Sequence, residues 1–220
     1  MNKKEIKTII SKRVAKEFSD GDVVNLGIGL PTLVANYVDD EINIILQSEN
    51  GFIGMAGTPP KGKEDPNLTN AGGQPVTIRK NAAFFDSSIS FSIIRGGHVD
   101  YTVLGALQVD QKGNLANWMI PNKFVPGMGG AMDLVTGSKY VIIAMTHMSR
   151  GKKKILKKCS LPLTAANEVD MIVTEMGVMK IKDGKIVLTE KHPDVTIEDI
   201  KKKTEAELVI SENLMEMKIN

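Results

Sequence analysis

The stretch VVNLGIGLPT, Val23 to Thr32, sets the fold class of this 220-residue chain. Val23–Leu26 is apolar enough for a short strand, and Gly27-Ile28-Gly29 then permits a tight turn. Pro31 suits the first turn of a helix, because the amide hydrogen that proline lacks would have no helical partner there. We therefore predict a strand, a glycine turn and a helix that runs to Tyr37, which together form one half of a βαβ unit.

Apolar runs that follow this stretch extend the pattern. Ile42–Leu46 and Tyr140–Met145 are continuous apolar runs, as expected for parallel strands that are buried on both faces. Val99–Val109 is interrupted at Gly105, which indicates a bulge or a close approach of the backbone. Before these runs, Ile6 to Phe18 carries apolar residues at helical spacing among lysines and predicts an amphipathic helix.

Further elements are predicted towards the carboxyl terminus. Thr58–Gln74 is rich in Pro, Gly, Lys and Asn and predicts a long surface loop. Lys180–Leu188 predicts a hairpin around a central Asp-Gly pair. Thr196 and Asp199 have the spacing of a helix-capping box, and Leu208–Ile210 is expected to form a last strand.

The composition is typical of a globular protein of the cytoplasm. Hydrophobic residues make up 42% of the chain, the net charge is only +2, and neither nucleic acid nor an anionic membrane is indicated as a partner. No signal peptide or membrane-spanning run is evident, and the single Cys159 fits a reducing cytosol. Without repeats or a linker, residues 1–220 are predicted to form a single α/β domain with one open, mostly parallel sheet flanked by helices.

Glu49 stands in the stretch ILQSENGFIG, directly before Asn50 and Gly51. Asn-Gly between apolar runs is a strong hairpin signal, because both residues tolerate positive φ. The buried run Ile42–Leu46 weighs against a simple hairpin and places Glu49 at the carboxyl edge of a parallel sheet. Two interpretations stay open: a solvated turn residue, which the local sequence favours, or a carboxylate nucleophile or base that the turn holds out.

Two glycine turns are candidates for contacts with a ligand. Gly27-Ile28-Gly29 lacks the third glycine of the dinucleotide fingerprint, so a plain turn and a backbone contact with a phosphate or pantetheine group are equally open. Gly127-Met128-Gly129-Gly130 lacks the Lys-Ser/Thr pair of a P-loop, which argues against ATP or GTP hydrolysis. We expect this segment, which leads through Ala131 into a possible helix, to offer backbone N–H groups to a carbonyl or an oxyanion.

The remaining chemically interesting side chains are expected to be structural. His98 and His147 have no neighbours at metal-ligand spacing, so no metal site is predicted. The cations beside Cys159 favour a lowered thiol pKa, but no partner histidine accompanies it. The basic run Arg150–Lys158 is expected to be a solvated face or a contact for the phosphates of a nucleotide-like ligand, without the aromatic residues typical of nucleic-acid binding.

Several segments, taken in order, resemble the motifs of class I coenzyme A (CoA) transferases. Gln47-Ser48-Glu49-Asn50-Gly51 is similar to the Ser-Glu-Asn-Gly signature at the catalytic glutamate of that family. Gly96–Asp100, Leu104–Ala106, Ala116–Trp118 and Gly127–Leu134 resemble the rest of the family's β part. Nearly the whole chain therefore resembles a β (B) subunit of this family, and equally the carboxyl-terminal half of its single-chain 3-oxoacid members.

The resemblance implies a reaction, a partner and a set of site residues. It implies CoA transfer between a short-chain acyl-CoA and a carboxylate, such as acetoacetate with acetate or butyrate, with CoA as substrate and no metal or nucleotide cofactor. It further implies an α subunit of similar fold in an α2β2 assembly. Glu49 would be the nucleophile that carries a glutamyl-CoA thioester. The other implied roles are oxyanion or CoA contacts for Gly105, Gly127, Gly129, Gly130, Ala131, Gly27 and Gly29, and positioning of the turn for Asn50 and Gly51.

Other functions on the same scaffold are also compatible with the sequence. An acyl-CoA hydrolase or a CoA-linked lyase subunit would use the same turns, and a sugar-phosphate isomerase would bind phosphate at them. A non-catalytic sensor of a small phosphorylated ligand belongs to a different class. Only a transferase exchanges acyl groups between two carboxylic acids.

Overall fold

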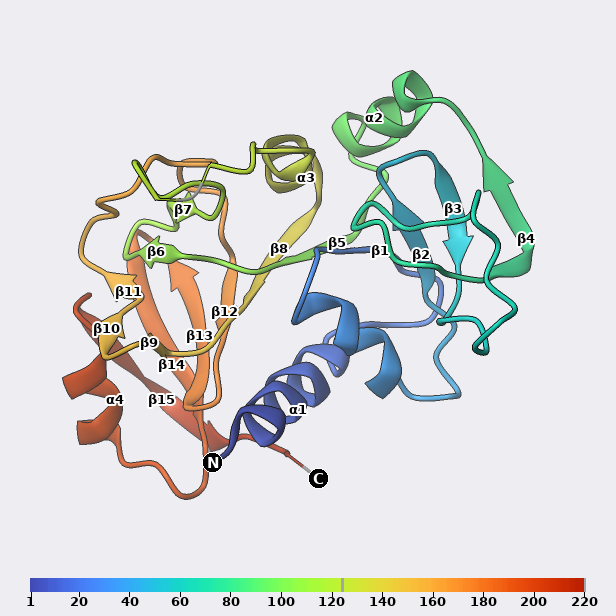
Figure 1. Ribbon diagram of the computed structural model, residues 1–220. Coiled ribbons are helices and arrows are strands. Elements are labelled where there is room, and N and C mark those ends of the chain that lie inside the picture. Colours follow the sequence, from blue (N-terminus) through green and yellow to red (C-terminus); the bar gives the residue numbers. More distant parts are fainter. Residues whose placement is uncertain (124, 220) are drawn as a thin grey trace.

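The computed structural model describes residues 1–123 and 125–219. Its main feature is a ten-stranded sheet with the strand order β15-β14-β13-β12-β8-β5-β1-β2-β3-β4 (Figure 1). The central strands β12, β8, β5, β1 and β2 run parallel to one another, and antiparallel pairs follow on both sides. The predicted open, mostly parallel α/β sheet with flanking helices is confirmed.

The bounds of the elements are as follows. The strands of the main sheet are β1 (Val23–Leu26), β2 (Ile45–Ser48), β3 (Phe52–Met55), β4 (Ile78–Phe84), β5 (Tyr101–Leu104), β8 (Tyr140–Ala144), β12 (Met171–Val173), β13 (Gly177–Lys182), β14 (Lys185–Lys191) and β15 (Leu208–Glu216). Smaller sheets contain β6 (Gln108–Asp110), β7 (Leu115–Ala116), β9 (Met148–Ser149), β10 (Lys152–Lys153) and β11 (Ile155–Leu156). The helices are α1 (Lys3–Ala15), the 3₁₀ helix η1 (Pro31–Tyr37), α2 (Ser87–Arg95), α3 (Ala131–Gly137) and α4 (Ile197–Lys203).

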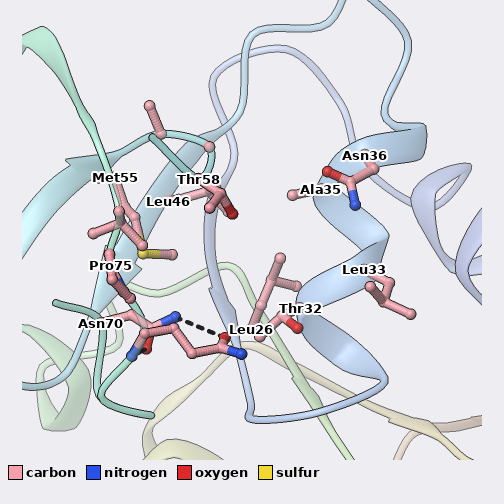
Figure 2. Close-up of a pocket in the computed structure, with 14 residues that line it drawn as sticks. Leu26, Thr32, Leu33, Ala35, Asn36, Leu46, Met55, Thr58, Asn70 and Pro75 are labelled. Carbon is pink, nitrogen blue, oxygen red and sulfur yellow. Dashed lines mark hydrogen bonds between the residues drawn. The ribbon is translucent and has the colours of Figure 1, made fainter. Parts of the chain in front are cut away.

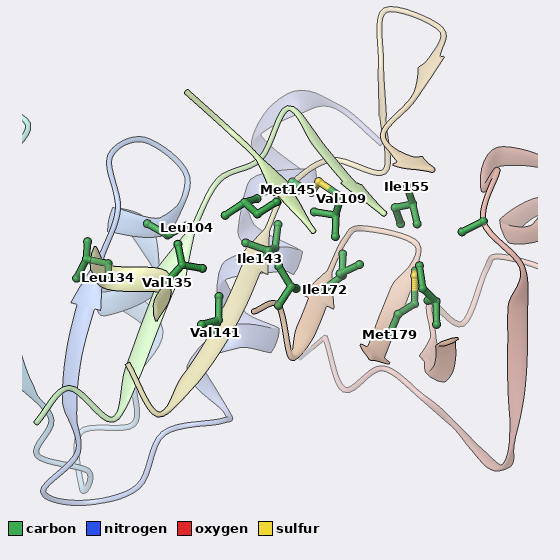
Figure 3. Close-up of a cluster of buried hydrophobic side chains, with 14 of the residues drawn as sticks. Leu104, Val109, Leu134, Val135, Val141, Ile143, Met145, Ile155, Ile172 and Met179 are labelled. Carbon is green, nitrogen blue, oxygen red and sulfur yellow. The ribbon is translucent and has the colours of Figure 1, made fainter. Parts of the chain in front are cut away.

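Two hydrophobic cores cover the two faces of the central sheet. In β8, Val141 and Ile143 belong to the core that also contains Leu134 of α3. Figure 3 shows this core. Ile142 and Ala144 belong to the core on the opposite face, beneath α1. Because both faces of this strand are buried, its sequence is continuously apolar rather than alternating.

Several predicted elements are confirmed. The amphipathic helix is α1, and α3 follows the second glycine turn. Thr196 caps α4, its hydroxyl accepting a hydrogen bond from the Asp199 amide at 3.1 Å. The predicted hairpin is β13–β14, and the predicted last strand is β15, which runs on to Glu216. The expected interruption at Gly105 lies between β5 and β6.

The structure corrects the prediction for the segment before Glu49 in two ways. The strand begins at Ile45 rather than Ile42, because the backbone of Asn43 bonds instead to the turn at Asp20 and Gly21. The hairpin is also present, since β2 pairs antiparallel with β3 while it pairs parallel with β1. The hairpin and the buried parallel strand are therefore compatible, and the argument against the hairpin was wrong.

Candidate active site

Loops from three neighbouring strands meet at one edge of the sheet. Gly27 follows β1, Glu49 follows β2 and Gly105 follows β5. The three strands are adjacent and parallel, so their carboxyl ends lie at the same edge. Loops at this edge form the ligand sites of open α/β sheets. The sheet topology therefore brings together residues that are far apart in the chain.

A cavity of about 640 Å³ opens at this edge. Among the described residues that line it, Glu49 has the only ionisable side chain, and Asn117 and Trp118 add polar groups. Its size lies in the range of about 300 to 1,000 Å³ that is typical of small-molecule sites. The cavity wall includes the predicted site residues Gly27, Gly105, Gly127, Gly129, Gly130 and Ala131.

Glu49 is half-buried and is held at both ends. Its side-chain oxygen Oε2 accepts a hydrogen bond from Asn25 Nδ2 at 3.2 Å. Its backbone carbonyl accepts one from the Ser90 hydroxyl at 2.8 Å. Gly51 closes the turn, its amide donating to the Ser48 carbonyl at 3.1 Å. Glu49 is thus a fixed carboxylate at a cavity wall, and the interpretation as a freely solvated turn residue is not supported.

Asn50 connects the turn to the long loop at residues 56–77. Its Nδ2 donates to the Thr69 carbonyl at 2.8 Å, and its Oδ1 accepts from the Ser48 hydroxyl at 2.6 Å. The Ser48 hydroxyl in turn accepts from the amide of Ala71, which lines the cavity. The loop predicted at Thr58–Gln74 is therefore fastened to the turn that carries Glu49.

Gly51 has a conformation that requires glycine. Its φ is +126°, and a side chain would collide with the Phe85 carbonyl oxygen. The amide of Phe85 donates to the Gly51 carbonyl at 2.9 Å, which holds the two segments together. The turn at Glu49 is therefore fixed by contact with the segment before α2.

The glycine segment before α3 lies directly against Glu49. A β-carbon added to Gly130 would lie 3.2 Å from Cγ of Glu49 and 3.5 Å from the ring of Phe91. Arg95 of α2 pairs with Asp133 of α3 at 2.6 Å and keeps the two helices adjacent. The N-terminus of α3 is thereby placed beside the carboxylate.

The two glycines of the turn Gly27-Ile28-Gly29 have different surroundings. The Gly27 amide donates to the Val103 carbonyl at 2.8 Å, and an added β-carbon would lie 2.8 Å from Leu104 Cδ2. Gly27 therefore permits close packing of β1 on β5, and its N–H group is already used within the sheet. Gly29 lies outside the cavity wall, where its carbonyl accepts from the Thr32 hydroxyl at 2.7 Å.

The other candidate residues lie outside the cavity wall. His98 is exposed, whereas the ring of His147 is buried between the hydroxyls of Thr174 and Thr204, each at 3.0 Å. Burial lowers the pKa of His147 to about 4. The basic run forms the β9–β10 turn and β11, with Arg150 in the turn.

The pKa of Cys159 shifts in the direction opposite to the one that its neighbours in the sequence suggest. Burial raises this pKa to about 12, and the negative charge of Asp110 adds to the shift. The Cys159 amide donates to Asp110 Oδ2 at 3.0 Å. Asp110 lies in β6, far from Cys159 in the sequence. The lysine next to Cys159 in the sequence therefore does not indicate the direction of its pKa shift.

A second hollow, of about 190 Å³, lies next to the first between η1 and the strands β2 and β3 (Figure 2). Ala35 of η1 points towards Met55 and Pro75 across it. Glu49 is not part of its wall. The larger cavity is therefore the candidate active site.

Three residues of the site were missed from the sequence. Asn25, Gln47 and Ser90 are almost completely buried and lie beneath Glu49. A polar residue inside an otherwise apolar strand was the available signal for the first two, because buried polar groups are expected to have specific partners. Ser90 had no such signal.

No helix within the described ranges is long and apolar enough to cross a membrane. Among the same residues, no group of three or more His, Cys, Asp or Glu side chains is placed to hold a metal ion. The arrangement instead presents a single carboxylate to a cavity built largely from backbone and apolar side chains. Such a carboxylate can act as a nucleophile or as a base.

Comparisons with known proteins show the family to which the chain belongs. The profile of the family described as coenzyme A transferase matches residues 7–203. Acetate CoA-transferase subunit beta of Haemophilus influenzae is 57% identical over 221 residues, which cover 100% of this chain and 97% of that protein. The chain belongs to the coenzyme A transferase family and is similar to its beta subunits.

Two further relatives show how this chain compares with longer proteins. The mitochondrial succinyl-CoA:3-ketoacid coenzyme A transferase 2B of Mus musculus is 46% identical over 96% of this chain, which spans 41% of that protein. The crystal structure of an acyl-CoA transferase apoenzyme from Escherichia coli O157:H7 superposes with a TM-score of 0.78 at 25% identity, over 97% of this chain and 43% of that one. The matched unit is therefore about two-fifths of these single-chain enzymes.

Proposed function

We propose that this CoA-transferase subunit moves CoA between a short-chain acyl-CoA and a carboxylate through a glutamyl-CoA thioester on Glu49. The observation that carries the proposal is the position of the Glu49 carboxylate, which is fixed by Asn25 and faces a glycine-lined cavity. Acetoacetate, acetate and butyrate are the proposed acids. CoA is a substrate in this scheme, and no further cofactor takes part.

The proposed reaction begins when the Glu49 carboxylate attacks the thioester carbonyl carbon. The C–S bond breaks, CoA leaves as a thiolate, and a mixed acyl-glutamyl anhydride remains. The thiolate then attacks the glutamyl carbonyl, the anhydride C–O bond breaks, and the first acid leaves as a carboxylate. The product is a glutamyl-CoA thioester, and an incoming carboxylate reverses the sequence, which is ping-pong catalysis.

A carboxylate is a weak nucleophile, so the cavity must stabilise the oxyanion that forms. We assign this role to backbone N–H groups of Gly129 and Gly130, which lie where the chain enters α3 beside Glu49. One such donor contributes about 3 kcal/mol to lowering the barrier. Gly105 is assigned to contact with CoA, because its α-carbon faces open space in the cavity wall.

The proposal includes an α subunit that covers the cavity. Ile28 lines the cavity and is 67% exposed. Val125 and Met132, which are sequence neighbours of residues in the cavity wall, are 61% and 48% exposed. Exposed apolar side chains of this kind mark interaction surfaces. The relatives named as beta subunits and the longer single-chain relatives support a second unit here. We propose an α2β2 assembly in the cytoplasm.

The test is mass spectrometry of the complex with its α subunit after addition of acetoacetyl-CoA. We expect CoA to be attached to the peptide that contains Glu49 and to be released by acetate with formation of acetyl-CoA. Release of free CoA without exchange between acids would support a hydrolase instead. Turnover with no adduct on Glu49 would contradict the proposal.

A further inference from the structure

Three buried side chains form a hydrogen-bonded network beneath Glu49. Asn25, Gln47 and Ser90 are 1%, 1% and 0% exposed. Asn25 Nδ2 donates to Gln47 Oε1 at 2.6 Å and to Glu49 Oε2 at 3.2 Å. Gln47 Nε2 donates to Ser90 Oγ at 3.2 Å, and Ser90 Oγ donates to the Glu49 carbonyl at 2.8 Å. The network therefore starts at the side chain of Glu49 and returns to its backbone.

We propose that Gln47 and Ser90 are positioning residues for the transfer reaction. They orient the Asn25 amide so that its N–H group, and not its oxygen, faces the carboxyl group of Glu49. This inference rests on the proposed function of Glu49 as the group that carries CoA.

The direction of the hydrogen bonds follows from the number of protons. A serine hydroxyl has one hydrogen, and that of Ser90 is directed at the Glu49 carbonyl, so its oxygen accepts from Gln47. Gln47 then has its amide oxygen directed at Asn25, which must present Nδ2. Ser90 thus determines the orientation of an amide that it does not touch.

The opposite orientation of Asn25 is unfavourable. It would direct Oδ1 at the Gln47 carbonyl, at Gln47 Oε1 and at Glu49 Oε2, all of which are acceptors. In the observed orientation Oδ1 has no hydrogen-bond partner within the described residues. An unsatisfied buried oxygen costs about 1 to 3 kcal/mol. The network therefore keeps the Asn25 N–H group directed at Glu49, in spite of the cost of leaving the Asn25 oxygen without a partner.

The orientation matters because negative charge is present on the Glu49 carboxyl group at several steps. It is a carboxylate in the free enzyme, and its carbonyl oxygen gains charge each time a thiolate or a carboxylate attacks the glutamyl carbon. A donor that is already in place stabilises this charge without reorganisation. An amide oxygen in the same place would repel it.

The fold supplies each member of the network from a rigid element. Asn25 of β1 and Gln47 of β2 are register partners on adjacent parallel strands. Ser90 lies in the first turns of α2, where its amide donates to the Asp86 carbonyl at 3.0 Å. Asp86 also caps α2 by accepting from the Ile89 amide at 2.9 Å. Ser90 is therefore held by a capped helix rather than by a loop.

The first experiment compares Ser90→Ala with Ser11→Ala in the complex with the α subunit. Ser11 of α1 is a matched control, because its hydroxyl is equally buried and has no partner in the described part of the chain. We expect Ser90→Ala to lower kcat about tenfold or more and to leave KM for acyl-CoA within about twofold, since small displacements of a reacting group are costly. We expect Ser11→Ala to change neither constant.

The second experiment uses Gln47→Glu and a pH profile. The introduced carboxyl group can donate to Ser90 only when it is protonated, and burial beside another carboxylate raises its pKa. The ratio of kcat in this variant to kcat in the parent should therefore rise as pH falls from about 8 to about 6. A purely structural defect would give a constant ratio.

The inference is overturned if Ser90→Ala retains parental kcat, if Ser11→Ala loses as much, or if the Gln47→Glu ratio is independent of pH. The rate of adduct formation on Glu49 separates this failure from failure of the proposed function. Adducts that form equally fast in the parent and in Ser90→Ala refute only the positioning role. A parent complex that forms no adduct refutes the proposed function itself.

Discussion

Gly130 and Glu49 lie against each other in the wall of the candidate active site, where an added β-carbon on Gly130 would lie 3.2 Å from Cγ of Glu49. The two residues come from different loops, one before α3 and the other after β2. Because Gly130 has only a hydrogen in place of a side chain, the side chain of Glu49 can lie directly against the backbone of the cavity wall.

We predict that Gly130→Ala lowers kcat by about tenfold, because misplacement of a reacting group by a fraction of an ångström is costly. The φ of −80° at Gly130 suits alanine, so the free energy of unfolding should change little. Steady-state kinetics and urea unfolding are the measurements. Gly57→Ala is the control, since a β-carbon there meets nothing within 4 Å. Parental kcat in Gly130→Ala would contradict the close approach.

Glu49→Gln should reduce acyl exchange by about a thousandfold or more, because an amide does not form the covalent intermediate. Glu49→Asp should also lose most activity, since its carboxylate is one methylene shorter. Exchange assays with labelled acetate and circular dichroism of the same samples provide the test. Glu41→Gln, an exposed loop residue, is the matched control and should retain parental activity. Wild-type turnover in a verified Glu49→Gln complex would show that the assignment is wrong.

Gly51→Val should destabilise the fold by about 2 kcal/mol or more, because φ is +126° and the Phe85 carbonyl oxygen occupies the space. It should also lower kcat by displacing Glu49. Gly62→Val is a useful comparison, since its φ is +81° but no atom lies within 4 Å of the added β-carbon. The difference in urea midpoints isolates the contact with Phe85. Equal stability and unchanged kinetics in the two variants would argue against a positioning role for the turn.

His147 should make stability depend on pH. Its pKa is about 4 in the folded protein and about 6.5 when unfolded, so the unfolded chain binds the proton more tightly. Stability from this group is complete above pH 6.5 and falls by up to about 3 kcal/mol as pH drops towards 4. Urea unfolding of the parent and of His147→Gln between pH 4.5 and 7 measures this. A parent whose pH dependence matches that of His147→Gln would refute the prediction.

Cys159 should resist alkylation in the folded protein. Burial and the nearby Asp110 raise its pKa to about 12, so the thiolate fraction at pH 8 is on the order of one in ten thousand. We expect iodoacetamide to label the protein slowly when native and rapidly in urea, as followed by mass spectrometry. Native labelling at the rate of a free cysteine would contradict the assigned environment.

The sequence by itself determined the class of fold and singled out one carboxylate as a candidate for the chemistry. Apolar runs such as Tyr140–Met145, together with glycine turns, predict buried parallel strands because local sequence carries both backbone preference and burial. The motif around Glu49 identified the carboxylate, and the turn residues Asn50 and Gly51 were recognised with it. These signals are local, and a sequence displays local signals directly.

Only the tertiary structure decided which residues support that carboxylate. Asn25 reaches Glu49 because β1 lies beside β2, and Ser90 of α2 reaches the Glu49 carbonyl, both relationships between segments that are distant in the chain. The same reason explains the pKa of Cys159, which is raised by burial and by the charge of Asp110 in β6 in spite of the adjacent lysine. Hydrogen bonds and charges act through space over a few ångströms, so sequence neighbours alone do not predict them.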